Sequence, residues 1–365
     1  FPDPVNGVIT LPANHTYFFS GILDLEGNRL VCEANVTILG GSSENSILKS
    51  TGLTGQALIT SQYSLPLRNF SITADIALNL NGAGPTTAAL DWFGVNFLNC
   101  GTVGTIQNYS NFIATDCAWL DSGPTTFDGS IGTIGFTSCI FNAASTKTVI
   151  IVPATATITR RFRAVYCAFV VLSGETGINL SASASIPDEG YILTACNFSG
   201  GGTYQAGLGN TSEKSLFINC RGIINTSTLG HCYMTNNATT TTVVANTFTK
   251  VLGTTTAGPF IEKFTHTNNR LTYIGALSGY FEVSAVCTIA TANNVTFNFR
   301  VAKNGTDSAA GESTVRQQSS TSFSSATSQD VFQLNTGDYI EVFMTGSTNG
   351  AYTIQDMSVL VKRLN

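Results

Sequence analysis

The sequence predicts an all-β protein, with a right-handed parallel β-helix over residues 1–237 and a jelly-roll β-sandwich over residues 238–365. Three observations support this fold class. A short Cys-containing pattern returns along the first part of the chain, and its segments are rich in β-branched and aromatic residues between Gly, Asn and Ser turns. No long window has the periodicity of an amphipathic helix. The last third alternates apolar and polar residues, as antiparallel strands with one buried face do.

The recurring pattern is an apolar or aromatic residue, a polar residue and a Cys, followed by apolar residues and a turn. The cysteines are separated by 17, 22, 28, 29 and 24 residues, which indicates a solenoid with one coil per repeat. Because Cys is small and often buried, we expect these side chains to form one internal column. A redox or metal array is the alternative. The cysteines are Cys100, Cys117, Cys139, Cys167, Cys196 and Cys220.

The other elements follow in chain order. Residues 7–21, 30–50 and 57–82 each contain short strand signals joined by turns, before the Cys-containing units begin. From about His231 the coil pattern ends and the chain becomes rich in Thr, so we place the domain boundary near Asn237. The remaining strand signals are longer and alternate cleanly, and about eight of them fit a jelly-roll sandwich.

The composition excludes several functions. Charged residues make up only 11% of the chain and the net charge is −5, which argues against nucleic acid as a partner. No apolar run reaches the roughly 18 residues of a membrane span. The nine cysteines are odd in number and lie in strand-like segments, so we expect reduced thiols and assembly in a cytoplasm. The chain opens at Phe1 without a signal segment, and we expect a preceding segment to have served in attachment or targeting.

The C-terminal part carries GYFEVSAVCTI, FNFRVAKNGT, VFQLNTGDYIEVFMTG and YTIQDMSVLVKRL in this order. It resembles the trimeric jelly roll of the C1q/tumour-necrosis-factor family. The first 235 residues, especially SSENSILKSTGLTGQALIT and ALDWFGVNFLNCGTVGTI, resemble β-helical tail-fibre or tailspike proteins of bacteriophages. These resemblances imply a homotrimer on the virion surface. The positions that match the jelly-roll pattern are Gly279, Phe281, Val283, Val331, Leu334, Gly337, Asp338, Ile340 and Val342.

Carboxylates and tryptophans on neighbouring turns form a candidate glycan site. Glycoside hydrolysis requires two carboxylates about 5–10 Å apart, and Asp116, Asp121 and Asp128 are the catalytic candidates. Trp119 and Trp92 are the candidate platforms for stacking on sugars. The alternative is that the Asp residues accept backbone hydrogen bonds in turns and that Trp119 packs inside. We therefore leave the catalytic hypothesis open and lean towards a protein that is not an enzyme.

Three arginines, Arg160, Arg161 and Arg163, cluster in the most β-branched stretch of the chain. In a strand, Arg161 and Arg163 share one face and Arg160 takes the other. Arg161 and Arg163 are candidates for contact with an acidic sugar or a phosphate. The alternative is an outward face paired with carboxylates such as Glu175, Asp188 or Glu189. The sequence shows no metal-ligand spacing, and we expect no cofactor.

The leading hypothesis is a phage spike or fibre protein that recognises and attaches to a glycan on the host surface. Its expected partners are two further copies of itself, the host glycan, and other virion proteins bound through an N-terminal segment. A head-decorating or cement-like capsid fibre is one alternative. A tailspike depolymerase that cleaves host polysaccharide is the other.

Overall fold

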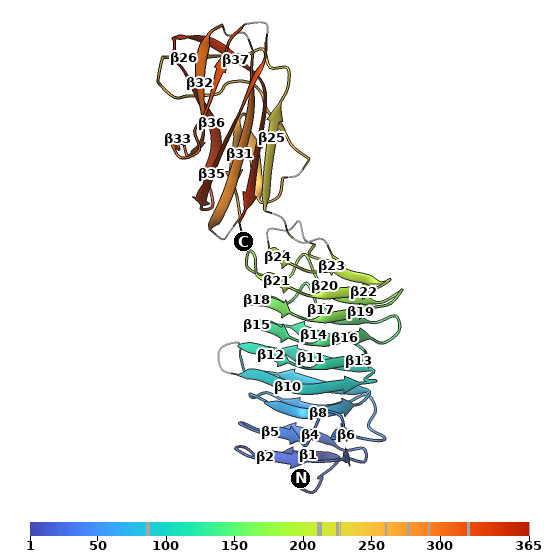
Figure 1. Ribbon diagram of the computed structural model, residues 1–365. Coiled ribbons are helices and arrows are strands. Elements are labelled where there is room, and N and C mark those ends of the chain that lie inside the picture. Colours follow the sequence, from blue (N-terminus) through green and yellow to red (C-terminus); the bar gives the residue numbers. More distant parts are fainter. Residues whose placement is uncertain are drawn as a thin grey trace. The chain divides into compact units, whose positions relative to one another are not determined.

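The structure is a computed structural model that describes residues 1–84, 88–209, 214–223, 226, 228–259, 261–275, 278–290, 293–319 and 322–364. Every regular element in these ranges is a β-strand, which confirms the all-β prediction. The chain forms two compact units, Phe1–Thr226 and Ser227–Asn365 (Figure 1). Each unit has a hydrophobic core of its own.

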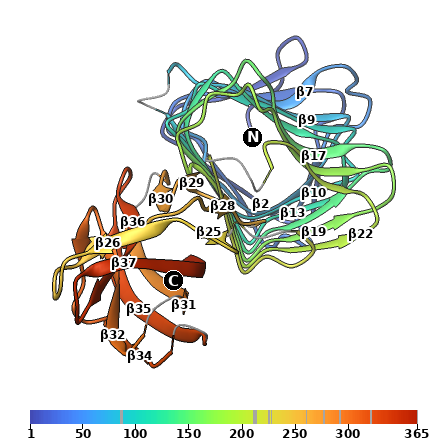
Figure 2. The ribbon, with the colours of Figure 1, turned by 90° about the horizontal axis from the view of Figure 1, so that it is seen from above.

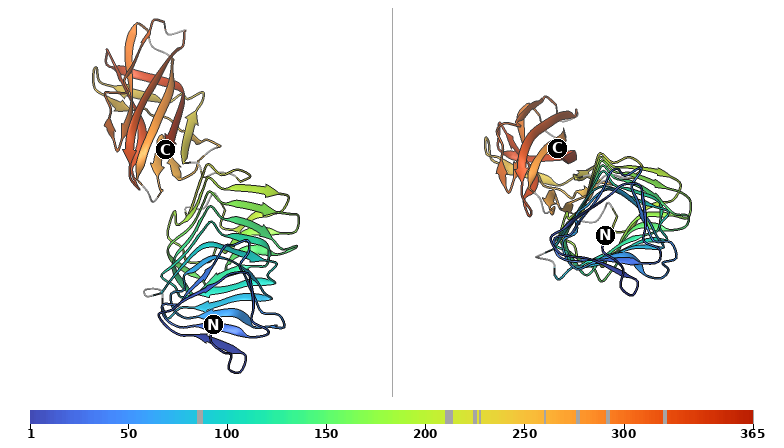
Figure 3. Two further views of the ribbon diagram at one scale, coloured as in Figure 1. Left: turned by 60° about the horizontal axis from the view of Figure 1, so that its bottom comes forward. Right: turned by 90° about the horizontal axis from the view of Figure 1, so that it is seen from below.

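The first unit is a parallel β-solenoid, in which each coil adds strands to two sheets (Figures 2 and 3). All strand pairs in these sheets are parallel, as between β10 and β12. The nine-stranded sheet contains β1 (Val8–Leu11), β4 (Arg29–Cys32), β7 (Ala57–Ser61), β9 (Ile76–Asn81), β11 (Thr102–Gln107), β14 (Thr125–Asp128), β17 (Thr148–Val152), β20 (Thr176–Leu180) and β23 (Thr203–Gly207). The fifteen-stranded sheet contains β2 (Thr16–Phe19), β3 (Ile22–Asp24), β5 (Thr37–Gly40), β6 (Ile47–Lys49), β8 (Leu67–Thr73), β10 (Ala89–Leu98), β12 (Asn111–Thr115), β13 (Ala118–Ser122), β15 (Ser130–Thr137), β16 (Ile140–Ala143), β18 (Thr157–Val165), β19 (Ala168–Val171), β21 (Tyr191–Thr194), β22 (Asn197–Gly200) and β24 (Ser215–Ile218).

Five of the six repeat cysteines form an internal ladder. Each Cys follows a corner residue with φ between 51° and 55°, and each thiol donates to the carbonyl oxygen two residues earlier. The members are Cys117, Cys139, Cys167, Cys196 and Cys220. Cys100 lies outside this ladder because Leu98 aligns with Leu120, which places Cys100 level with Ser122. The Cys100 N–H donates to Ser122 Oγ at 3.1 Å.

An aromatic stack runs beside the Cys ladder and sets the register of the coils. Phe97, Trp119, Phe141, Phe169 and Phe198 occupy equivalent positions on successive strands. The rings of Phe141 and Phe169 are 4.5 Å apart, and those of Phe169 and Phe198 are 4.6 Å apart, both nearly parallel. A one-residue slip would turn the whole row outward, so the buried row specifies the register.

The second unit is a β-sandwich of two antiparallel sheets with a core between them. β25 pairs along β37, so this strand belongs to the second unit although it precedes the boundary expected near Asn237. The six-stranded sheet contains β25 (Leu229–Met234), β26 (Thr240–Val243), β28 (Thr256–Ala257), β31 (Gly279–Ala290), β35 (Ser324–Leu334) and β37 (Gly350–Arg363). The seven-stranded sheet contains β27 (Thr249–Lys250), β29 (Phe264–Thr267), β30 (Arg270–Tyr273), β32 (Val295–Lys303), β33 (Thr306–Asp307), β34 (Ser313–Gln317) and β36 (Tyr339–Gly346).

Candidate functional site

The outward face of β10, β12, β15 and β18 carries an open groove of about 510 Å³, which we call the arginine groove. Parallel register places its lining in two rows that cross these strands. One row is Ala89, Asn111, Thr133 and Arg161. The other is Asp91, Ile113, Gly135 and Arg163. Each row therefore ends in an arginine on β18.

All three arginines of the sequence cluster are exposed and line this groove. The expectation that Arg160 takes the opposite face from Arg161 is wrong because β18 has a bulge. Ile131 pairs with Ile158 and Thr133 pairs with Arg161, so one residue of β15 faces two residues of β18. A bulge of this kind shifts the alternation of side chains by one residue. Arg160 consequently joins Arg161 and Arg163 at the same end of the groove.

The guanidinium groups of this cluster have no ion-pair partner within the part of the chain that the structure describes. The alternative of pairing with Glu175 fails because that carboxylate accepts the Leu172 N–H at 2.7 Å in a turn. Guanidinium groups are rigid forks that suit carboxylate and phosphate oxygens, so the cluster can bind an oxyanion.

The opposite end of the groove contains a charge pair that is already satisfied. Arg68 forms an ion pair with the Asp91 carboxylate and also donates to the Asp91 carbonyl oxygen at 2.6 Å. Phe93 follows on the same strand with 43% of its surface exposed. Between the two ends, the floor carries the amide of Asn111, the hydroxyl of Thr133 and the apolar side chain of Ile113. This floor is uncharged and offers both hydrogen bonds and apolar contact.

The three candidate catalytic carboxylates lie at different positions on or beside the consecutive strands β13 and β14. Asp116 and Asp121 occupy corners of one coil with φ of 52° and 49°, and Asp128 ends the next strand. Asp128 Oδ1 accepts hydrogen bonds from the Gly129 N–H and the Thr155 hydroxyl at 2.7 and 2.8 Å. None of the three lines the arginine groove.

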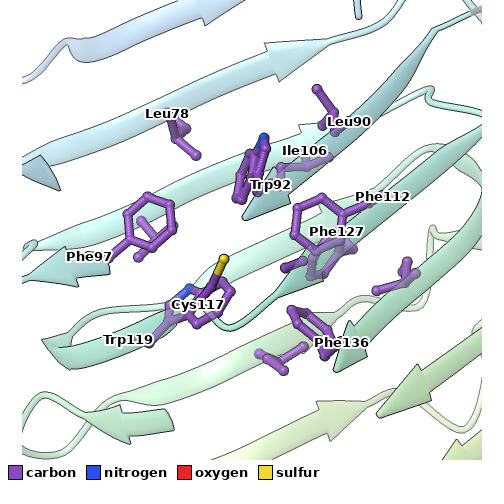
Figure 4. Packing of buried hydrophobic residues seen from close by; sticks show 14 of the residues in the cluster. Leu78, Leu90, Trp92, Phe97, Ile106, Phe112, Cys117, Trp119, Phe127 and Phe136 are labelled. Atoms are coloured by element: carbon purple, nitrogen blue, oxygen red, sulfur yellow. The ribbon is translucent and has the colours of Figure 1, made fainter. Parts of the chain in front are cut away.

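The two tryptophans lie inside the solenoid, so neither offers a surface platform for a sugar (Figure 4). Trp119 is fully buried and donates from Nε1 to the Thr125 hydroxyl at 2.9 Å. Trp92 is also fully buried and packs edge-on against Phe112, with ring centroids 4.7 Å apart. Because both side chains are buried, the prediction that they contact a glycan is wrong. The sequence did contain the signal for Trp119, because Cys-x-aromatic recurs at Phe141, Phe169 and Phe198.

A second open surface lies over the nine-stranded sheet and is uncharged at its centre. Two adjoining grooves, of about 730 and 580 Å³, share Thr60, Asn79 and Gln107. Charged residues occur only as Glu33 in one and Arg29 in the other. This surface provides a matched comparison for the arginine groove, since it belongs to the same unit but lacks a cationic cluster.

The described residues contain no group of three or more His, Cys, Asp and Glu side chains that could hold a metal ion. All nine cysteines are buried, and none forms a disulfide bond. Burial raises the pKa of Cys32, Cys232 and Cys287 to about 12, which keeps these thiols protonated at neutral pH. In the same part of the chain, no helix is long and apolar enough to cross a membrane.

The fold and site together define a parallel β-solenoid, whose outer face carries a groove lined by three exposed arginines, and an additional β-sandwich. No family model and no curated protein matches the chain. Solved structures with similar regions include murine APRIL, with 13% identity and a TM-score of 0.28, covering 37% of this chain and 98% of that one. Eiger TNF from S. frugiperda has 13% identity and a TM-score of 0.29, covering 38% and 94%. The PRD1 vertex protein P5 has 13% identity and a TM-score of 0.29, covering 38% and 96%. Similarities at this level do not bear on function.

Proposed function

We propose that the protein is a bacteriophage spike or fibre protein that attaches the virion to a glycan on the host surface. The observation that carries this proposal is the arginine groove, whose cationic end has no partner among the described residues and whose floor is uncharged and polar. Shallow grooves with hydrogen-bonding and apolar groups are suited to the hydroxyls and ring faces of sugars. The low charge content of the chain also suits a virion component exposed to the medium.

The proposal includes a homotrimer formed through the second unit, with a right-handed solenoid and a jelly roll of the C1q/tumour-necrosis-factor type. The outer face of the six-stranded sheet supports self-association. Tyr280, Val286, Val331 and Leu360 expose 60%, 42%, 51% and 40% of their surfaces on neighbouring strands β31, β35 and β37. Exposed apolar patches mark interaction surfaces, and here the four side chains share one sheet face with polar neighbours such as Glu282 and Ser284. Three copies would multiply weak glycan contacts into avidity.

The trimer is tested by native mass spectrometry of the purified chain. A trimer should form, and Leu360→Lys with Val331→Lys should release monomers because charges would be buried between copies. Val244→Lys, at another exposed position, is the control and should leave the assembly unchanged. A monomer in the unmodified protein at all concentrations would contradict this part of the proposal.

Attachment is tested by incubating the protein with host cells, capsule and lipopolysaccharide from a panel of strains, with measurement of both binding and released oligosaccharide. We expect binding without release. Release that disappears in Asp116→Asn, Asp121→Asn or Asp128→Asn would instead identify a depolymerase. Absence of binding to every cell and glycan would favour a head-decorating or cement-like role.

A further inference from the structure

Resting on the proposed function, we infer that the glycan bound in the arginine groove is a heteropolymer with one anionic sugar followed by neutral sugars. The anionic group is an oxyanion, either the carboxylate of an acidic sugar or a phosphate substituent. This inference comes from how charge is distributed along the groove. It names the ligand class, which the proposed function leaves open.

All of the unpaired positive charge that lines the arginine groove belongs to one coil. Arg160, Arg161 and Arg163 lie on β18, and the side chains of Arg161 and Arg163 leave the strand about 6.6 Å apart. Two guanidinium forks at this separation can hold one carboxylate or phosphate between them, with charge-assisted hydrogen bonds from both. All three side chains are exposed, so a ligand can reach their guanidinium groups.

Among the described groove residues, the strands on the β10 side of β18 offer no further unpaired charge. β15 and β12 contribute Thr133, Gly135, Asn111 and Ile113, and β10 contributes an Asp91 carboxylate that Arg68 neutralises. An anionic unit above these strands would lose its hydration without gaining a cationic partner, which is unfavourable. Neutral sugars, in contrast, can hydrogen-bond to Asn111 and Thr133 and pack on Ile113. The order of anionic and neutral sugars along the bound glycan therefore follows from the order of the strands.

The length of the groove sets the length of the bound segment. Neighbouring strands are about 4.8 Å apart, so the three steps from β18 to β10 span about 14 Å, which matches roughly three or four sugars of an extended glycan. The arginines of β18 then bind one of these sugars. A nucleic acid strand fits less well because it carries one phosphate per nucleotide, whereas this groove has cations at only one level.

The test uses polysaccharides of known repeat with the full-length protein. The probes are a heteropolymer with one glucuronate per repeat, the same polymer after chemical reduction of its carboxyl groups, a glycan with one phosphate monoester per repeat, and the same glycan after dephosphorylation. Polygalacturonate, dextran and single-stranded DNA complete the set. We expect one of the two singly charged polymers to bind about tenfold or more tightly than its neutral derivative, as charge-assisted hydrogen bonds imply, and the binding to weaken with salt. Whether the carboxylate or the phosphate polymer binds identifies the source of the oxyanion.

Variants locate the binding to the groove. Arg161→Ala with Arg163→Ala should reduce affinity about tenfold or more, and the corresponding double Lys variant should retain part of it, because charge remains but the fork is lost. Arg29→Ala on the other sheet is the control and should bind normally. Tryptophan fluorescence, which reports on the solenoid interior, verifies folding of each variant.

Equal binding of the polymer before and after carboxyl reduction or phosphate removal would overturn the inference. So would tighter binding of polygalacturonate or DNA, since neither has one charge followed by neutral units. A neutral host glycan whose binding requires Asn111 or Thr133 would overturn the inference while leaving the proposed function in place. Failure to bind any glycan or host cell would instead overturn the proposed function itself.

Discussion

The aromatic stack of the solenoid should be the most sensitive part of the first unit to truncation. Phe169 is fully buried and stacks on Phe141 and Phe198 with interplanar angles of 11° and 6°. Replacing Phe169 by Ala removes one ring from the middle of the stack. The strands on either side are fixed by parallel hydrogen bonding, so the coils cannot collapse into the vacated space. Phe→Ala substitutions in cores cost about 3–5 kcal/mol, and we expect about 4 kcal/mol here.

The measurement is urea unfolding followed by tryptophan fluorescence. The chain contains two tryptophans, Trp92 and Trp119, and both lie inside the solenoid, so the signal reports on this unit alone. Phe93→Ala is the matched control: its ring is 43% exposed, and the change should be about 0.5 kcal/mol or less. The loss of unfolding free energy for Phe169→Leu should fall between these two values. This variant replaces Phe169→Ala in the test if the Ala variant does not fold. A loss below about 1 kcal/mol for Phe169→Ala would refute the idea that the stack supports the fold.

Three further predictions concern buried polar groups. Thr125→Val leaves the Trp119 indole N–H without its acceptor and should destabilise the solenoid by about 1–3 kcal/mol, with Thr125→Ser as the control that restores the hydroxyl. The nine buried thiols should not react with a thiol reagent in the native protein and should all react in denaturant; rapid reaction of the native protein would show an opened coil. Partial burial alone would raise the pKa of Asp338, but hydrogen bonds from Lys303, Asn304 and the Asn335 N–H outweigh it and hold the pKa at about 2. The stability that this carboxylate provides is therefore present above its ordinary value near 3.8 and is lost as the pH falls towards 2. NMR titration should show this midpoint, and Lys303→Met should raise it; an unchanged midpoint would mean that the ion pair does not form.

Repetition made the solenoid predictable, and breaks in repetition caused the errors. The Cys-containing pattern marks equivalent positions in successive coils, which is why the ladder from Cys117 to Cys220 could be expected. Cys100 follows the same short pattern but occupies a different corner, because β10 continues past the position where later coils bend before their Cys. A local motif does not contain this difference in strand length. It becomes visible only when the strands are aligned.

The site was predictable in part. Arg161 and Arg163 were identified from their alternation, and they lie where a ligand can reach them. Arg160 was assigned to the wrong face because a bulge depends on the partner strand, where Gly132 alone lies opposite both Thr159 and Arg160. Asn111 and Thr133 carry no motif and were missed. Their placement follows from register across coils, which sequence spacing alone does not provide.

In this fold, recognition and stability depend on different side chains of the same strands. On β18, Phe162 and Ala164 point into the core, whereas the alternating residues Arg161 and Arg163 point outward. Changing the outward residues does not alter core packing, so Arg161→Ala with Arg163→Ala should change the unfolding midpoint by about 0.5 kcal/mol or less while weakening binding. Phe169→Ala should do the reverse, with reduced stability and normal affinity at temperatures where the variant is folded. This separation gives the outer face freedom to vary coil by coil, which is why a single cationic coil can lie among uncharged ones without disturbing the stack beneath it.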